Sequence, residues 1–208
     1  MIIGICGLIG SGKDTVAQTL IDNHQFVKTS FADKLKDAVA AMFNWDRELL
    51  DGKTDKSRDW REQKDEFWTK ETGREITPRL VLQEFGTECM RNGFFDGIWV
   101  SLTKQQLIQN PDTNFVITDV RFPNEAKMIL ETGGQVWRVK RGLDPMWFRV
   151  YQDIGVEPKD VHPSEWAWAN TNFNAVFENN ATINSLKNQV QDHLVSNGFL
   201  QGAKIFGN

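Results

Sequence analysis

The sequence contains few residues of three chemically versatile types: its 208 residues include one Tyr, two Cys and three His. Cys6 and Cys89 stand far apart, outside any C-x-x-C or zinc-ligand spacing, which argues against a disulfide scaffold, a thioredoxin-type motif and a zinc site. We therefore expect two buried, reduced thiols. The longest largely apolar run, 1–10, is too short to cross a membrane and has no basic leader. These features predict a cytoplasmic protein with no membrane partner.

A basic excess is also missing, since the formal net charge is −4. Non-specific binding to nucleic acid normally needs such an excess, so we expect no direct nucleic-acid partner. Any phosphate must be held by a local cluster of basic side chains and backbone N–H groups. Hydrophobic residues make up 40% and charged residues 25% of the chain, which is typical of a folded protein. This length suits a single domain over 1–208.

Segments typical of strands alternate with segments that have helical spacing. The expected strands are 2–6, 26–30, 115–119, 135–140 and 175–178. The expected helices are 13–23, 31–43, 77–91, 97–109, 123–132 and 183–195. This alternation predicts an α/β fold in three layers, with a central, mainly parallel five-stranded sheet and helices on both faces. The stretch 141–170, which contains three prolines, is expected to be irregular.

One segment, about 45–76, interrupts this pattern. Most residues between Arg47 and Glu75 are charged, and the two signs alternate. It is interpreted either as a flexible, solvated insertion or as a lid that covers the substrate. Most of the eight Trp lie here or in 141–170, where we expect them mainly to anchor polar segments by packing.

A phosphate-binding motif lies between the first expected strand and the first expected helix. Gly7 to Lys13 reads G-x-x-x-x-G-K, and this position in the fold is the one that the motif requires. The glycines let successive backbone N–H groups point into one concavity, at the positive end of the helix. We predict ATP binding by Gly10, Ser11, Gly12 and Lys13, with Lys13 at the β- and γ-phosphates.

The residue after Lys13 is Asp14, where this motif usually has Ser or Thr, and Thr15 follows. Both residues are predicted to take part in ATP binding. Thr15 is our candidate to support Mg²⁺ and phosphate, and Asp14 either binds Mg²⁺ through water or caps the loop. Asp119, at the end of the strand 115–119, is a further candidate for Mg²⁺ through water.

Five blocks of the sequence resemble the deoxynucleoside monophosphate kinases of tailed bacteriophages, within the P-loop nucleoside monophosphate kinase superfamily. They are GSGKDTVA at 10–17, SFADKLK at 30–36, TPR with QEFGTE within 77–88, DVRFPNEA at 119–126 and HPSE at 162–165. Together they cover the chain from Met1 to about Asn170, and the segment 47–75 matches least. The resemblance implies transfer of the γ-phosphoryl group of ATP to a deoxynucleoside monophosphate, with Mg²⁺, to supply precursors for DNA synthesis. It implies location in the host cytoplasm if the protein is of phage origin.

The same resemblance assigns roles to individual residues. Lys13 and Arg121 become the catalytic residues, because phosphoryl transfer needs positioning and positive charge more than a nucleophile. Arg121 would clamp both phosphates, and Arg79 would hold the acceptor phosphate. Further candidates for substrate binding are Asp33, Lys36, His162 and Glu165. The preferred base, the selection of deoxyribose and the oligomeric state stay open, with a homodimer as one option.

Two other functions remain in competition. The first is another small-molecule P-loop kinase such as dephospho-coenzyme A kinase, although that family usually has Ser at the position of Asp14. The second is a regulatory ATPase that binds nucleotide without a small acceptor. Against it, Asp119 is followed by Val120 and Arg121 rather than by a second carboxylate that could activate water. ADP formation from ATP alone would favour the ATPase.

Overall fold

The computed structural model describes residues 1–199, and the chain forms two compact units. The first unit contains Met1–Ser30 and the chain from Asn110 onward, and the second contains Phe31–Gln109. The charged segment 45–76 is therefore part of a larger unit that begins at Phe31. That the whole chain works as one catalytic domain stays a prediction.

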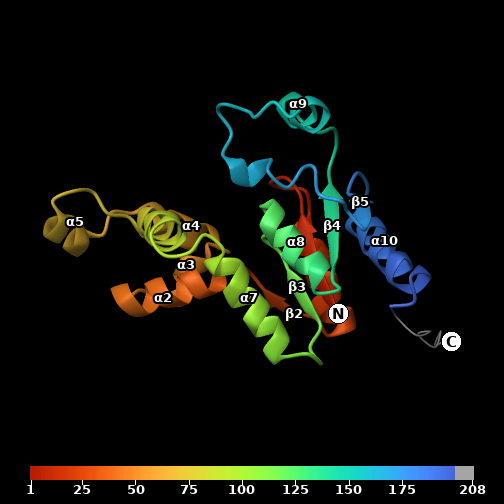
Figure 1. Ribbon diagram of the computed structural model, residues 1–208, viewed down its shortest axis with the longest axis horizontal. Coiled ribbons are helices and arrows are strands. Elements are labelled where there is room, and N and C mark those ends of the chain that lie inside the picture. The colour runs from red at the N-terminus through yellow and green to blue at the C-terminus, as the bar shows by residue number, and fades with distance from the viewer. Residues whose placement is uncertain (200–208) are drawn as a thin grey trace. The chain divides into compact units, whose positions relative to one another are not determined.

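The first unit is built on one parallel sheet (Figure 1). Its strands are β1 (Ile2–Cys6), β2 (Val27–Thr29), β3 (Phe115–Ile117), β4 (Gln135–Lys140) and β5 (Ala175–Glu178). They pair in the order β2-β3-β1-β4-β5, and every pairing is parallel. The predicted five-stranded sheet is confirmed, and its parallel order places the carboxyl ends of all five strands at one edge.

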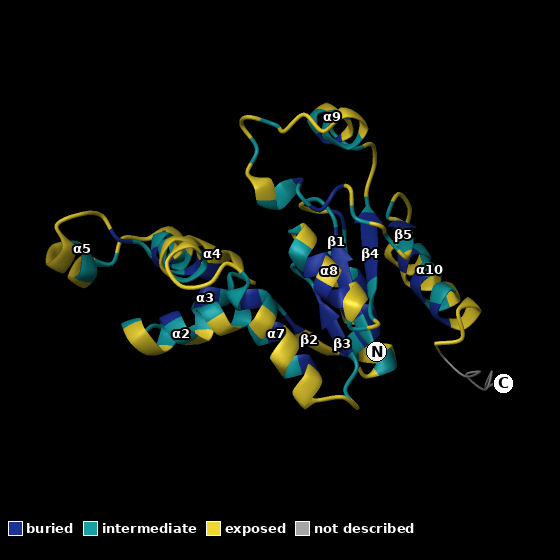
Figure 2. Ribbon diagram, viewed as in Figure 1, coloured by how far each residue is buried: buried dark blue, intermediate teal, exposed yellow. Residues whose placement is uncertain are grey.

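Helices cover both faces of this sheet. α1 (Lys13–His24) packs against α10 (Ile183–Ser196). Buried side chains of both helices form one hydrophobic core with Ile3 and Ile5 of β1. The intervening residue Gly4 faces the opposite side, where a Cβ atom would lie 2.5 Å from the Ile129 side chain of α8 (Pro123–Glu131). The central strands β1, β3 and β4 are accordingly buried on both faces, as the dark blue ribbon in Figure 2 shows, whereas the edge strands β2 and β5 keep exposed residues. This is the predicted three-layer arrangement.

A histidine packs against the aromatic side chains of the core beside the fully buried Trp137 of β4. The His193 ring of α10 lies 5.2 Å from Trp137 and 5.6 Å from Phe177, measured between ring centroids. Burial lowers the pKa of His193 below its ordinary value. The folded protein therefore holds this imidazole neutral under conditions in which the unfolded chain begins to protonate it.

His193 should make the folded protein less stable in mild acid. Below about pH 6.5 the unfolded chain binds a proton that the folded chain resists, so this stability is lost as the pH falls. His193→Phe should therefore lose less unfolding free energy than the wild type between about pH 7.5 and pH 5.5 in urea titrations. Above about pH 7.5 the two proteins should respond to pH alike, because neither state protonates the imidazole there. Equal losses in acid would contradict the role of His193.

The stretch 141–170 contains two helices, so the prediction of irregular structure is wrong there. α9 (Met146–Ile154) begins after Pro145, and the short 3-10 helix η2 spans Pro163–Glu165. The guanidinium carbon of Arg138 lies over the rings of Phe148, at 4.8 Å from the centroid, and of Trp168, at 5.6 Å. Arg138 also forms an ion pair with Asp144. These contacts with β4 order a segment whose own sequence signals are weak.

The second unit is helical. It contains α2 (Asp33–Phe43), α3 (Arg47–Asp51), α4 (Asp55–Glu62), α5 (Glu66–Thr72), α6 (Pro78–Gln83), the π-helix η1 (Glu84–Asn92) and α7 (Ile98–Gln109). The predicted start at Thr77 is confirmed, because its hydroxyl accepts a hydrogen bond from the Leu80 amide at 3.1 Å. The helix expected over 77–91 changes to π-helical geometry at Glu84. Cys89 of η1 is exposed because η1 turns this side chain to solvent, so only Cys6 fits the expectation of buried thiols.

The charged segment is folded around tryptophans. Trp45 stacks on Phe43 with centroids 4.6 Å apart, and Trp60 meets Trp45 edge-on at 5.9 Å. The indole of Trp45 donates a hydrogen bond to Asp65, at 2.9 Å. These rings pack on the second unit's buried residues Val39, Leu50, Ile76 and Val81. The prediction that tryptophans anchor this charged segment by packing is confirmed here, because the segment's tryptophan rings supply the apolar surface that contacts this core.

Across residues 1–199, no helix has both the length and the apolar character needed to span a bilayer.

Candidate active site

The phosphate-binding loop joins β1 to α1 in the first unit. Gly10 and Gly12 have φ angles of +74° and +107°, in the left-handed region that favours glycine. Gly12 is the N-cap residue of α1 and offers no capping side chain. The positive end of α1 is therefore available to an anion.

Asn179, directly after β5, supports this loop and was not among the predicted site residues. Its side-chain amide donates to the Ser11 carbonyl at 2.8 Å, and a Cβ atom on Gly12 would lie 2.5 Å from the same nitrogen. Gly12 therefore leaves space for Asn179. The only signal in the sequence is the position of Asn179 at the carboxyl end of a strand.

A cavity of about 410 Å³ lies beside the loop. Its lining residues are Gly10, Gly12, Lys13, Asp14, Thr15, Arg141, Asn179, Ala181 and Ile183. Ser11 is buried, and its hydroxyl has no hydrogen-bond partner within residues 1–199. A cavity bordered by a glycine loop, a lysine and a helix N-terminus fits the phosphate chain of a nucleotide.

Lys13 is partly buried and hydrogen-bonded to its own loop. Its ammonium group donates to the carbonyls of Gly7 at 2.7 Å and Leu8 at 3.0 Å. Burial lowers the pKa of Lys13, and the nearby Arg121 lowers it further, whereas Glu165 and Asp14 oppose the shift. Lys13 and Arg121 thus form a pair of neighbouring cations whose proximity is costly without an anion.

Arg121 is held from both its side chain and its backbone. Its guanidinium group donates to Glu165 at 3.0 Å and to the Ser164 hydroxyl at 3.2 Å. The buried carboxylate of Glu125 accepts hydrogen bonds from the amides of Arg121 at 2.7 Å and Phe122 at 3.1 Å. Ser164 and Glu125 were not predicted as site residues. Glu125 is the N3 residue of α8 and accepts from the amide of the N-cap residue Phe122, which is one half of a capping box, since the Phe122 side chain has no acceptor to supply the other half.

Four of the predicted residues of the first unit line a second, smaller cavity. Its lining includes Lys13, Asp119, Arg121, Ser164 and Glu165. His162 belongs to the same group of contacts, because its Nδ1 accepts a hydrogen bond from the Ser164 amide at 3.2 Å and lies 2.9 Å from the Ser164 hydroxyl. The Ser164 hydroxyl oxygen also accepts the hydrogen bond from Arg121, so Ser164 connects His162 to the Arg121 guanidinium group.

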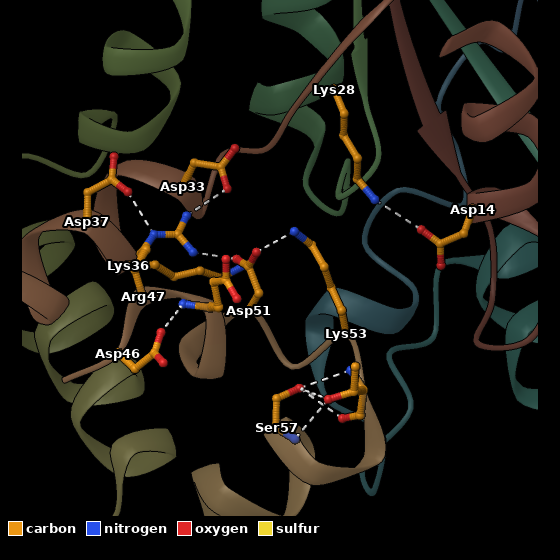
Figure 3. Close-up of polar contacts among 12 residues, drawn as sticks. Asp14, Lys28, Asp33, Lys36, Asp37, Asp46, Arg47, Asp51, Lys53 and Ser57 are labelled. Atoms are coloured by element: carbon orange, nitrogen blue, oxygen red, sulfur yellow. Dashed lines mark hydrogen bonds and ion pairs between the residues drawn. The ribbon is translucent and has the colours of Figure 1, made fainter. Parts of the chain in front are cut away.

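Three predicted oxygen donors for Mg²⁺ lie near the loop. Thr15 and Asp14 line the larger cavity and Asp119 the smaller one, but the exposed Asp14 carboxylate is 3.2 Å from the Lys28 ammonium group (Figure 3). In the described part of the chain, no group of three or more His, Cys, Asp or Glu could hold a metal by itself. This donor set fits Mg²⁺ that takes most of its ligands from nucleotide phosphates and water.

The other predicted substrate residues, Asp33, Lys36 and Arg79, lie in the second unit. Arg47 donates to Asp33 at 3.2 Å, to Asp37 at 2.7 Å and to Asp51, and Lys36 forms an ion pair with Asp51 at 3.2 Å (Figure 3). Burial of Asp51 opposes its ionisation, but hydrogen bonds from Lys53, Arg47 and Lys36 hold its pKa well below the usual range. Arg47, Asp37, Asp51 and Lys53 of this network were not among the predicted site residues.

Arg79 lies in the first turn of α6, as predicted, and its guanidinium group is 2.8 Å from Glu62 of α4. Its side chain is half exposed. A ligand could therefore compete with Glu62 for this group.

Among the known proteins compared, a viral relative matches nearly the whole chain. A protein of Acanthamoeba polyphaga mimivirus, provisionally named a deoxynucleotide monophosphate kinase, is 32% identical over 203 residues, covering 91% of this chain and 94% of its own. The deoxynucleoside-5′-monophosphate kinase of Escherichia phage T5 is 42% identical over 57 residues, 27% of this chain and 23% of its own. No protein-family model matches the chain.

Solved structures provide more distant likenesses. TT1252 from Thermus thermophilus is 19% identical with a TM-score of 0.48, covering 97% of this chain and 98% of its own. Dephospho-CoA kinase from Campylobacter jejuni is 13% identical with a TM-score of 0.48, covering 96% of this chain and 98% of its own. Likenesses at this level carry no argument about activity.

The parallel sheet with the order β2-β3-β1-β4-β5 and the glycine loop before α1 define a P-loop kinase fold. The match to the mimivirus protein extends over the sheet and both units. The chain therefore belongs to the deoxynucleotide monophosphate kinase family and is a phosphotransferase. The relatives give no better support to dephospho-coenzyme A kinase.

Proposed function

We propose that this enzyme transfers the γ-phosphoryl group of ATP to a deoxynucleoside 5′-monophosphate, which yields ADP and the deoxynucleoside diphosphate. The observation that carries the proposal is the placement of Lys13 and Arg121 around one cavity beside the phosphate-binding loop. Two neighbouring cations suit a group whose negative charge is spread over several phosphate oxygens.

The reaction needs one bond to form and one to break. An oxygen of the acceptor phosphate bonds to the γ-phosphorus, and the bond from that phosphorus to the β,γ-bridging oxygen breaks, so that its electron pair leaves with ADP. The acceptor oxygen is already anionic, so no general base is required. Catalysis then depends on alignment and on stabilisation of the negative charge.

The first unit supplies the donor side of the reaction. The loop from Gly10 to Gly12 and the N-terminus of α1 would bind the ATP phosphates. Lys13 would exchange its bonds to the carbonyls of Gly7 and Leu8 for phosphate oxygens. Thr15, with Asp14 and Asp119 through water, would support Mg²⁺, which neutralises charge on the phosphates when bound.

The remaining predicted residues would act on the acceptor nucleotide. Arg121 would contact the transferred group, and Glu165 and Ser164 would keep its guanidinium aligned. His162 and Glu165 would contact the acceptor nucleotide, and in the second unit Arg79, Asp33 and Lys36 would do the same, with Arg79 at the phosphate. Three expectations stay predictions: that the protein is located in the cytoplasm, that it forms a homodimer and that it does not contact nucleic acid.

Replacing Arg79 with alanine should raise the KM for the monophosphate by about 10- to 100-fold, because a charge-assisted contact to the acceptor phosphate is lost. The KM for ATP should change by less than about twofold. Initial rates measured while each substrate is varied separately check this prediction. If the KM for ATP rises instead, Arg79 belongs to the donor side.

The proposal is tested by measuring ADP formation from ATP with each deoxynucleoside and ribonucleoside monophosphate in turn. We expect ADP only when a deoxynucleoside monophosphate is present, and the pattern across the panel reports the preferred base. ADP formation of equal rate without any monophosphate would support a regulatory ATPase and overturn the proposal.

A further inference from the structure

Arg61 lies in the last turn of α4 and is half-buried. Its Nε is buried and has no hydrogen-bond partner within residues 1–199. The guanidinium group lies directly against Gly52, where an added Cβ atom would be 2.1 Å from Nη2. Gly52 ends α3 with a φ angle of +64°, so glycine serves both the turn and the space for Arg61.

The carboxylates that face Arg61 are already paired with other cations. Arg79 and Arg58 face Arg61 as like charges, and Glu62 and Asp51 face it as opposite charges. Glu62 is 2.8 Å from Arg79, and Asp51 receives hydrogen bonds from Lys36 and Arg47. The remaining cation, Arg58, pairs with Asp55 at 2.6 Å.

Burial and the nearby Arg79 lower the pKa of Arg61. A positive charge in such surroundings is costly, and proteins keep one where a ligand compensates it. α4 packs against α6, and the contact between Glu62 and Arg79 joins the two helices at this point. Within residues 1–199, Arg61 therefore lies without a carboxylate of its own next to Arg79, the arginine proposed above to bind the acceptor phosphate.

We propose that Arg61 binds the phosphate of the acceptor monophosphate and forms a two-arginine phosphate site with Arg79 inside the second unit. A guanidinium group matches two phosphate oxygens at once, which a lysine cannot do. The identity of the ligand as a nucleoside monophosphate rests on the proposed function. The existence of an anion site at Arg61 rests on the charges and burial described above.

Kinetics and stability together separate binding from a structural role. Arg61→Met should raise the KM for the monophosphate at least about tenfold while the KM for ATP changes less than about twofold, and Arg61→Lys should recover part of the loss. The melting temperature of Arg61→Met should stay equal to the wild type or rise, because an uncompensated charge has been removed. Arg149→Met, at an exposed arginine of α9, is the control and should leave both quantities unchanged.

A pair of glycine variants tests the same site without removing the arginine. Gly52→Ala places a methyl group where the guanidinium lies, whereas Gly73→Ala, at a φ angle of +69° at the end of α5, meets no atom within 4 Å. Both changes strain a left-handed turn equally. Only Gly52→Ala should raise the KM for the monophosphate, and equal effects would contradict the placement of Arg61.

A binding measurement keeps the inference independent of turnover. In NMR spectra of the arginine Nε–H groups, inorganic phosphate should shift the Arg61 signal, identified by its loss in Arg61→Lys. Such a shift without any kinase activity would preserve the anion site and reject the proposed function. An unshifted Arg61 signal, or an unchanged KM for the monophosphate in an active Arg61→Met, would overturn the inference.

Discussion

Lys13→Met is expected to lower kcat by about 10³-fold, because it removes positive charge that stabilises the transferring phosphoryl group. Methionine keeps the length of the side chain, so the loop is expected to retain its shape. The hydrogen bonds from Lys13 to Gly7 and Leu8 are lost, but the loop is also held by Asn179 through Ser11. Single-turnover rates at saturating ATP and monophosphate measure the chemical step directly.

Lys187→Met provides a matched control on the exposed surface of α10. It removes the same type of charge from a residue that lines neither cavity and should leave kcat within about twofold of the wild type. A Lys13→Met enzyme that turns over at a near-normal rate would contradict the role of Lys13 at the γ-phosphate.

The second large effect is expected at Arg121. Arg121→Met should lower kcat by about 10²- to 10³-fold, and Arg121→Lys should restore only part of it, since a lysine cannot use the two-pronged geometry of a guanidinium. The contacts from Nη1 of Arg121 to Ser164 and Glu165 support this expectation, because they fix the orientation of the guanidinium plane. Rates of the chemical step for the two variants provide the test.

Arg121 should also influence the pH profile through Lys13. Both burial and Arg121 lower the pKa of Lys13, so activity of the free enzyme should decline with rising pH earlier than for an ordinary lysine. Removal of the Arg121 charge should move that decline in kcat/KM to higher pH. Arg149→Met should keep the wild-type profile, and an unmoved decline in Arg121→Met would show that the two cations do not interact.

The sheet and the phosphate-binding loop were predictable because their signals are local. Short β-branched runs produce the strands, and the glycines before Lys13 permit the positive φ angles of Gly10 and Gly12. The N-cap at Thr77 was likewise predictable, because Thr77 and the Pro78 that follows it are neighbours in the sequence. The grouping of Lys13, Asp119 and Arg121 followed from the parallel order, which brings strand ends to one edge.

The features that escaped prediction depend on partners distant in sequence. Asn179 reaches Ser11 across 168 positions, and no spacing rule connects them. α9 is ordered when Phe148 packs on Arg138 of β4, although its own segment is divided by prolines. The carboxylates near Arg61 are paired with other cations, Glu62 with Arg79 and Asp51 with Lys36, and no local sequence pattern predicts these pairings.

The central claim is that this chain moves a phosphoryl group to a deoxynucleoside monophosphate. The most direct measurement follows ATP labelled in its γ-phosphate and separates the products with and without the preferred monophosphate. The account predicts that the label appears in the deoxynucleoside diphosphate, and only when the monophosphate is present. Release of the label as inorganic phosphate, at the same rate with or without the monophosphate, would contradict it.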